Sequence, residues 1–187
     1  MRRSHDVSAD TRTRILDAAE ELFAEAGYNG TSTAGIAKRA KVPKGLVFHY
    51  FPQKIDVLTT LIHERTFVEE VSDAETVHGD PADALSGLAR RFPLRASPAM
   101  RRILFREADT HGSARERLRR VNAEVVRRAR SALELTLPGS RGDAARLEAA
   151  AATFATVLLY QEGLQHLTGQ HVDPDAVAEL IVHALGA

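Results

Sequence analysis

The segment that decides the fold is residues 27–54, GYNGTSTAGIAKRAKVPKGLVFHYFPQK. Its apolar residues recur at helical spacing in two short runs, on either side of Pro43. Pro43 disfavours helical geometry at Val42 and presets its own φ for a new helix start. The segment therefore predicts two short helices joined by a tight turn, the second over about 43–50.

The same segment carries a local positive charge. From Tyr28 to Lys54 there are five basic residues and no Asp or Glu, although the 187-residue chain has 25 of each charge and a net charge of zero. The basic residues are Lys38, Arg39, Lys41, Lys44 and Lys54. Such a field predicts that a polyanion docks here, and DNA is the obvious candidate. The alternative is a helical bundle with a solvated basic face.

A third helix is predicted before these two. Three apolar stripes should bury against one another: Ile15, Ala19, Leu22, Phe23 and Ala26; Ile36, Ala37 and Ala40; Leu46, Val47, Tyr50 and Phe51. Gly27 stands where a left-handed cap would end the first helix. Thr31 and Ser32 offer hydroxyls to cap the next helix, whereas Gly35 removes the acidic half of a capping box.

These motifs, in this order, resemble the tetracycline-repressor (TetR) family of bacterial regulators. The residues that carry the resemblance lie between about 11 and 62: ILDAAEELF at 15–23, GY at 27–28, TST at 31–33, IA at 36–37, Val42, KG at 44–45, HYF at 49–51 and Lys54. The resemblance implies an all-α fold of about nine helices. It would comprise a three-helix helix-turn-helix (HTH) DNA-binding domain and a larger helical ligand-binding and dimerisation domain.

The resemblance also implies a mechanism and a set of DNA contacts. A homodimer would place two recognition helices in successive major grooves of a double-stranded, near-palindromic operator, and a small-molecule effector would release it. The implied DNA-binding residues are Thr33, Lys44, Gly45, Leu46, His49, Tyr50 and Lys54. Thr33 and Lys54 should meet phosphates, His49 and Tyr50 the DNA backbone, and Lys44 and Gly45 the base edges.

Two residues depart from the family pattern in the recognition helix. Phe48 stands where the family often has Tyr, so a phosphate-directed hydroxyl is missing. Leu46 stands where a small hydroxyl residue is frequent, which favours apolar contact with a thymine methyl group. Phe48, together with Gly35 in the preceding helix, leaves open a second interpretation, a TetR-like ligand-binding dimer that has lost sequence-specific DNA binding.

The rest of the chain predicts further helices and no strands. Residues 1–9 should be a flexible tail, 10–54 the HTH domain and 55–187 the ligand-binding and dimerisation domain. Helix starts are indicated at Lys54, Asp80-Pro81, Ser97-Pro98, Gly112-Ser113, Asp143 and Asp173-Pro174, with a stop near Pro138-Gly139.

Apolar residues of the last two predicted helices suggest an assembly surface. The proposed homodimer interface comprises Leu147, Ala151, Leu158, Val177, Leu180 and Ile181. A helix that is apolar over most of its circumference is buried on several sides, which fits a four-helix interface between two copies. The central helix of a monomer would show the same pattern.

A ligand pocket is implied among the middle helices by the resemblance. Its expected lining is Phe67, Leu88, Phe92, Met100, Leu104, Phe105, Phe154, Tyr160 and Gln161. These residues would look the same as plain core. Glu107 and His111 are further polar candidates for orienting a ligand.

Composition and missing motifs narrow the function classes. There is no cysteine, which removes thiol catalysis and zinc–thiolate sites, and no cofactor is indicated. No apolar stretch approaches the roughly 20 residues that span a bilayer, and the start lacks a secretory core, so a cytoplasmic protein without a membrane partner is expected. His63-Glu64 begins like a zinc-protease helix, but Phe67 stands where the second histidine is required. The sequence therefore predicts a regulator and not an enzyme.

Overall fold

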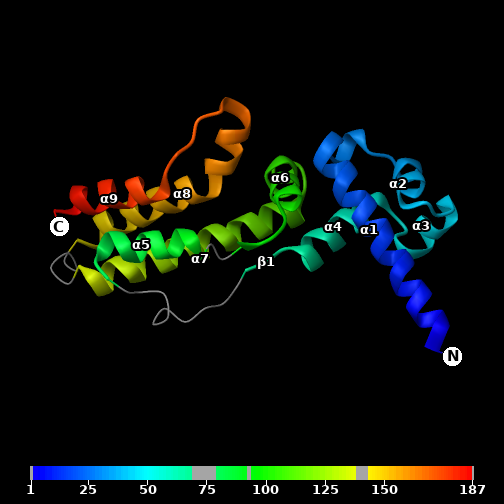
Figure 1. Ribbon diagram of the computed structural model, residues 1–187, viewed down its shortest axis with the longest axis horizontal. Helices are drawn as coiled ribbons and strands as arrows, with labels where there is room; N and C mark the ends of the chain where they lie inside the picture. The colour runs from blue at the N-terminus through cyan, green and yellow to red at the C-terminus, as the bar shows by residue number, and fades with distance from the viewer. Residues whose placement is uncertain (1, 69–78, 92–93, 138–142, 187) are drawn as a thin grey trace. The chain divides into compact units, whose positions relative to one another are not determined.

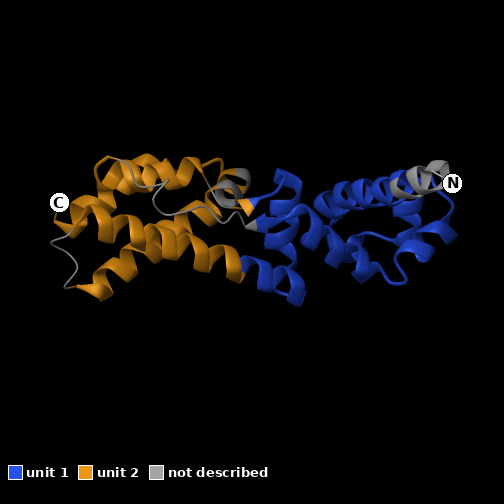
Figure 2. Cartoon of the chain, turned by 90° about the horizontal axis from the view of Figure 1, so that it is seen from below, with its two compact units in different colours: residues 1–67, 95–118 blue, residues 68–94, 119–187 orange. Residues whose placement is uncertain are grey.

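The computed structural model describes residues 2–68, 79–91, 94–137 and 143–186, and these form two compact units. Unit 1 comprises Met1–Phe67 and Arg95–Leu118, and unit 2 comprises Val68–Leu94 and Arg119–Ala187 (Figure 2). The described residues contain nine helices, α1 to α9, which confirms the predicted all-α class (Figure 1). Two strands of two residues each, β1 (Phe67–Val68) and β2 (Leu94–Arg95), pair with each other. They are too short to leave a periodic signal in the sequence.

Unit 1 is built around α1, the helix with the most neighbours among those of the unit. Its elements are α1 (Arg2–Gly30), α2 (Thr33–Ala40), α3 (Lys44–Tyr50), α4 (Lys54–Arg65), α6 (Pro98–Glu107) and the first part of α7 (Gly112–Thr136). The helix α1 packs against α2, α4 and α6, and α2 packs against α3. The apolar stripes meet as predicted at Phe23, Ile36 and Val47, whose side chains have no exposed surface.

The helix α1 has a distinct feature at each end. It begins at Arg2, so the backbone of residues 2–9 is helical, and the flexible tail expected there stays a prediction. At its other end the chain kinks at Gly27, where φ is +75°. The sequence places a left-handed cap at Gly27, but its ψ of 171° lies outside the left-handed helical region, and a final turn follows to Gly30. There the Thr31 hydroxyl donates to the Gly27 carbonyl oxygen at 2.8 Å.

Unit 2 packs α5 (Pro81–Arg90), α8 (Ala144–Thr168) and α9 (Pro174–Leu185) with the remainder of α7. The helix α9 contacts both α5 and α8. Aspartates at 80, 143 and 173 accept backbone N–H groups at the starts of α5, α8 and α9, as the sequence predicts. The predicted stop near Pro138-Gly139 lies outside the described residues, and the predicted domain boundary after residue 54 stays a prediction.

Candidate nucleic-acid interface

The helix α2 is held at both ends by polar contacts. At its start, the Ser32 hydroxyl accepts the Gly35 N–H at 3.0 Å, which is the predicted cap. At its end, Lys41 takes a left-handed conformation with φ +56°. The Arg14 guanidinium, which comes from α1, donates to the Ala40 and Lys41 carbonyl oxygens at 2.6 and 3.0 Å. The last carbonyl groups of α2 are thereby satisfied by the neighbouring helix.

The helix α3 buries one face and exposes the other. Val47 is fully buried, and Phe51, just past the helix end, is nearly so. Most positions of α3 predicted to contact DNA are exposed: Lys44, Gly45, Leu46 and His49. Leu46 is 37% exposed, although its spacing placed it on the buried face. Val47 and Phe51 fill that face without it.

Lys54, predicted to hold a phosphate, makes contacts within the chain. Its ammonium donates to the Tyr28 and Thr31 carbonyl oxygens at 2.8 and 2.9 Å and lies 4.0 Å from the Tyr28 ring centroid. The start of α4 is thereby fixed to the end of α1. Burial, together with the negative charges of Asp56 and Glu107, raises the pKa of Tyr28 above its ordinary value. A phosphate contact by Lys54 stays a prediction.

Side chains at the end of α6 hydrogen-bond to the backbone at the end of α1. The Glu107 carboxylate, only 4% exposed, accepts the Tyr28 N–H at 2.9 Å and lies 3.2 Å from His111 Nδ1. Arg106 donates to the Phe23 carbonyl oxygen at 3.2 Å. A side chain at Gly27 would bring its Cβ to 3.3 Å from Arg106 Cδ. We call these contacts the α1–α6 joint. Glu107 and His111, which the sequence suggests as residues that orient a ligand, here contact Tyr28 and each other.

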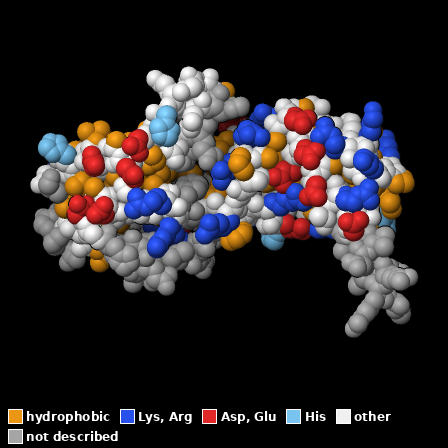
Figure 3. Space-filling model, viewed as in Figure 1, with side chains coloured by type: hydrophobic (Ala, Val, Ile, Leu, Met, Phe, Trp, Pro, Cys, Tyr) orange, Lys and Arg blue, Asp and Glu red, His pale blue; other side chains and the backbone are white. Residues whose placement is uncertain are grey.

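The basic residues of the predicted segment divide into two groups. Arg39 is ion-paired with Glu21 at 2.7 Å and with Glu25 at 3.5 Å, so its charge is largely offset. Lys38, Lys41 and Lys44 have exposed side chains. Figure 3 shows basic and hydrophobic side chains together at the edge of unit 1 that α2 and α3 occupy. Thr33 and Tyr50, also predicted to contact DNA, are half-buried.

The residues predicted to line a ligand pocket are divided between the two units. Phe67, Met100, Leu104 and Phe105 belong to unit 1, and Leu88, Phe154, Tyr160 and Gln161 to unit 2. Phe67 and Tyr160 are more than half exposed, whereas Leu88, Met100, Leu104 and Phe154 are core side chains. Phe92 lies outside the described residues. The pocket therefore stays a prediction.

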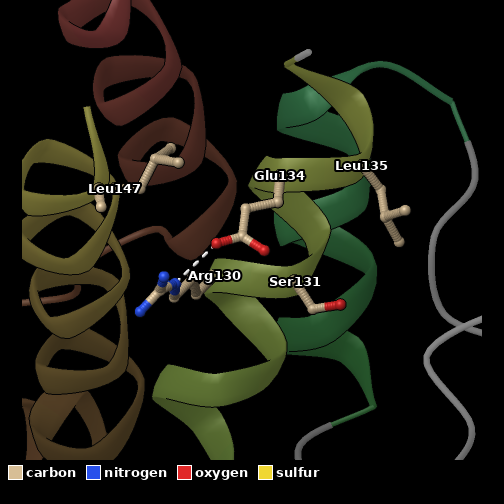
Figure 4. Close-up of a pocket in the computed structure, with 6 residues that line it drawn as sticks. Arg130, Ser131, Glu134, Leu135 and Leu147 are labelled. Atoms are coloured by element: carbon tan, nitrogen blue, oxygen red, sulfur yellow. Dashed lines mark hydrogen bonds and ion pairs between the residues drawn. The ribbon is translucent and has the colours of Figure 1, made fainter. Parts of the chain in front are cut away.

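A cavity in unit 2 has a different lining. It measures about 350 Å³ and lies between α7 and α8 (Figure 4), lined by Arg130, Ser131, Glu134, Leu135, Ala144 and Leu147. Arg130 Nε and Glu134 Oε1 lie 2.7 Å apart, and Arg130 also pairs with Glu148 at 3.2 Å. The charges that face the cavity thus already offset one another.

The residues predicted to form the dimer interface differ in how much of their side-chain surface is exposed. Leu147, Ala151, Leu158 and Ile181 are buried within the single chain. Val177 is half-buried and Leu180 is 67% exposed. Only the last two could therefore contribute substantial new apolar contact with a second copy.

Two other site types find no support in the part of the chain that is described. There, no three His, Cys, Asp or Glu residues gather as metal ligands would. No described helix combines the length and hydrophobicity that a bilayer crossing requires.

The geometry of unit 1 defines a class of protein. Two short helices with a tight turn pack on a third helix, and the second presents an exposed face beside exposed lysines. This is the helix-turn-helix class of DNA-binding domain. Residues 15–60 match the family model described as bacterial regulatory proteins, tetR family. Over these residues the chain is similar to the DNA-binding region of TetR-family regulators.

Known relatives share part of the sequence and most of the fold. The HTH-type transcriptional repressor BepR of Brucella suis biovar 1 (strain 1330) is 30% identical over 109 residues, which are 56% of this chain and 52% of BepR. The chain thus spans about half the length of that relative, and less of the next ones. The hemolysin II transcriptional regulator HlyIIR has a similar structure, with a TM-score of 0.61 at 19% identity over 94% of this chain and 97% of HlyIIR.

A second similar structure was solved with its ligands. It is AibR in complex with isovaleryl coenzyme A and operator DNA, with a TM-score of 0.57 at 17% identity over 94% of this chain and 97% of AibR. At this level of identity, both structural comparisons show the fold alone.

Proposed function

We propose that this protein is a ligand-responsive transcriptional regulator, a dimeric repressor that a small-molecule effector releases from a double-stranded operator. The observation that carries the proposal is the outward face of α3. It exposes Lys44, Gly45 and His49 on a helix held in place by Val47 and by the contacts of α2 with α1. Lys38 and Lys41 add exposed positive charge from α2 and the turn.

Dimerisation supplies the specificity that one helix of seven residues cannot. Two recognition helices one DNA turn apart, about 34 Å, read two half-sites of an operator. We place the contact between copies on α9, where Leu180 and Val177 retain exposed apolar surface. AibR, which has the same fold, was solved with operator DNA and an acyl thioester of coenzyme A, so a small-molecule effector fits this architecture.

We expect the effector to act through the α1–α6 joint. The helix α6 contacts both α1 and α4, so a shift of α6 would reach the helices that orient α3. Effector and DNA affinity would then be coupled through a two-state element. A saturating effector that left DNA affinity unchanged would contradict this half of the proposal.

The test of DNA binding is a gel-shift assay with the promoter region beside the protein's own gene, over a range of salt concentrations. Repressor function predicts specific retardation that weakens steeply with salt, because bound phosphates release counterions. No retardation even at low salt would favour the alternative, a ligand-binding dimer without sequence-specific DNA binding. The missing hydroxyl at Phe48 and the internal contacts of Lys54 are consistent with that alternative.

Lys44→Ala tests whether α3 reads bases. If Lys44 donates to a guanine edge, the variant should lose about 1–3 kcal/mol of binding to the operator and much less to random duplex. Its side chain is exposed, so the fold should be unaffected. Equal losses on both duplexes would show that Lys44 contacts phosphate only.

A further inference from the structure

The outward face of α3 has an unusual composition at its centre. With 3.6 residues per turn, Gly45 and His49 lie roughly opposite the buried Val47 on the helix. Leu46 and Phe48 lie on the two sides of Gly45. A Cβ added at Gly45 would have no atom within 4 Å. The face is therefore a backbone notch flanked by two large apolar side chains.

Both flanking side chains are exposed to solvent and are not needed to pack α3 against the rest of unit 1. Leu46 is 37% exposed and Phe48 is 44% exposed, while the interior contact of α3 is made by Val47 and Phe51. Neither exposed side chain has a hydrogen-bond donor or acceptor. The two side chains lie about 160° apart around the helix axis, so each borders the notch from its own side, and an α3 that entered a major groove would bring both against base edges.

The charges around this face identify its occupant as DNA. Lys44 Nζ lies 5.6 Å from the Phe48 ring centroid, a cation–π contact that holds the ammonium beside the ring. Lys38 and Lys41 are exposed in the same helix-turn-helix. An apolar protein surface would not match this cationic rim, whereas a major groove offers phosphates at its edges and base edges at its floor.

We propose that Phe48 is a specificity residue that reads thymine by its 5-methyl group, together with Leu46, while Gly45 lets the helix backbone approach the groove floor. The thymine methyl is the apolar group that DNA displays among the hydrogen-bonding edges of the major groove. This proposal rests on the proposed function and specifies what the same site recognises. It assigns to Phe48 a role in place of the missing hydroxyl.

The experiment removes the methyl group and nothing else. Duplexes that the full-length protein binds are first selected from a random-sequence pool, and the best one is resynthesised with single thymines replaced by deoxyuridine. Dissociation constants are measured by fluorescence anisotropy at one salt concentration. We expect one thymine in each half-site whose replacement weakens binding about fourfold, the effect of exposing one methyl-sized apolar group.

The variant Phe48→Ala assigns the effect to its side chain. It should weaken binding to the thymine duplex and abolish the difference between thymine and deoxyuridine at that position. Lys38→Ala is the matched control, because an exposed cation on α2 should weaken binding to both duplexes by the same factor. Thermal unfolding of each variant verifies that its fold is retained.

Three outcomes would overturn the proposal, and they are distinguishable. If a duplex is selected but no deoxyuridine replacement weakens binding, the protein binds DNA without reading thymine methyls through this face. If Phe48→Ala changes the sedimentation mass and leaves DNA affinity intact, the face joins two copies of the chain. If no duplex is selected over random sequence, the proposed function fails as well.

Discussion

The two units of this chain are held together in different ways. In unit 1, charged side chains reach from one helix to the carbonyl groups or ions of another: Arg14 to Ala40, Lys54 to Tyr28, and Arg65 to Asp17 at 2.5 Å. In unit 2, several ion pairs on α7 join residues three or four apart, as in Arg127–Glu124 and Arg130–Glu134. Fewer of the described contacts of this unit reach between helices: Arg130 pairs with Glu148 at 3.2 Å, and Arg146 donates to the Ala184 carbonyl oxygen at 2.7 Å. Pairs between its helices, such as Arg90–Asp175, join exposed side chains.

This difference corresponds to what each unit must do. Directional bonds to backbone groups fix the angle between helices, which a recognition helix needs because base contacts tolerate little displacement. Apolar packing specifies less, since cores accept volume-conserving substitutions with modest loss of stability. The contrast suggests variants that should affect one unit and spare the other.

Leu180→Asp should have the largest effect, and it should be confined to self-association. In a symmetric dimer the change removes two leucine side chains from the interface and places two carboxylates there. Burying one leucine stabilises by about 1.5–3 kcal/mol, so we expect dimer affinity to fall at least about 100-fold. Sedimentation velocity measures the change.

The control for Leu180→Asp is Leu135→Asp, which replaces another exposed leucine of unit 2 outside the proposed interface. It should leave the mass of the assembly unchanged. If both variants remain as associated as the parent protein, the contact between copies lies elsewhere.

Glu107→Ala should destabilise unit 1 through the α1–α6 joint. It deprives the Tyr28 N–H of its acceptor and removes the carboxylate that faces His111. Hydrogen bonds to a charged group contribute about 1.5–3 kcal/mol, and we expect a loss of that size in the free energy of unfolding. Urea denaturation followed by circular dichroism measures it.

Two further variants define the cause of that loss. Glu107→Gln should recover part of the stability, because its amide oxygen can still accept the Tyr28 N–H. Asp109→Ala, two residues further along the chain and exposed, should have little effect. Equal stability of Glu107→Ala and Asp109→Ala would show that the joint contributes nothing.

The sequence predicted local geometry in both units better than it predicted contacts. Helix starts at Lys54, Pro81 and Pro98 and the Ser32 cap follow from nearby residues, and the structure confirms them. These features depend on side chains within a few positions of the backbone groups they satisfy.

Contacts between residues far apart in the sequence could not be predicted in the same way. The spacing of Lys54 says nothing of the two carbonyl groups it binds, more than 20 residues earlier. A period of 3.6 residues likewise cannot tell whether an apolar face meets its own chain or a second copy. Leu147 and Leu180 share the pattern, yet only Leu180 is exposed.

Gly45→Ala should separate stability from recognition within unit 1. The added Cβ would have no atom within 4 Å. Because Ala is favoured over Gly in a helix by about 0.5–1 kcal/mol, the free energy of unfolding should increase. DNA binding should weaken, because the methyl group occupies the notch that faces the groove. Gly112→Ala, which also adds a methyl group in open space, should leave DNA binding intact. Unchanged operator affinity in Gly45→Ala would place α3 away from the groove floor.

The smallest effect we expect is a difference in acid sensitivity between the two kinds of ion pair. Hydrogen bonds from Arg12 hold the pKa of Glu64 below its ordinary value, and those from Arg127, aided by Arg128, do the same for Glu124. A carboxylate with a lowered pKa stabilises the fold above its unfolded value of about 4.3, and this stability is lost as pH falls through the folded pKa.

Glu64→Gln should therefore flatten the fall in stability below about pH 5 by a few tenths of a kcal/mol, because the Arg12–Glu64 pair is partly exposed. Glu124→Gln should flatten that fall too, but it should also lower stability at neutral pH, because Glu124 is a partner of Arg128, whose side chain is only 2% exposed. The two variants should differ in where the change occurs. Arg12–Glu64 joins α1 to α4, so hydrogen exchange at acid pH should change in both helices of unit 1. Arg127–Glu124 lies within α7, so its loss should change exchange only around that turn. Identical exchange patterns in the two variants would mean that the long-range pairs of unit 1 do not tie its helices together.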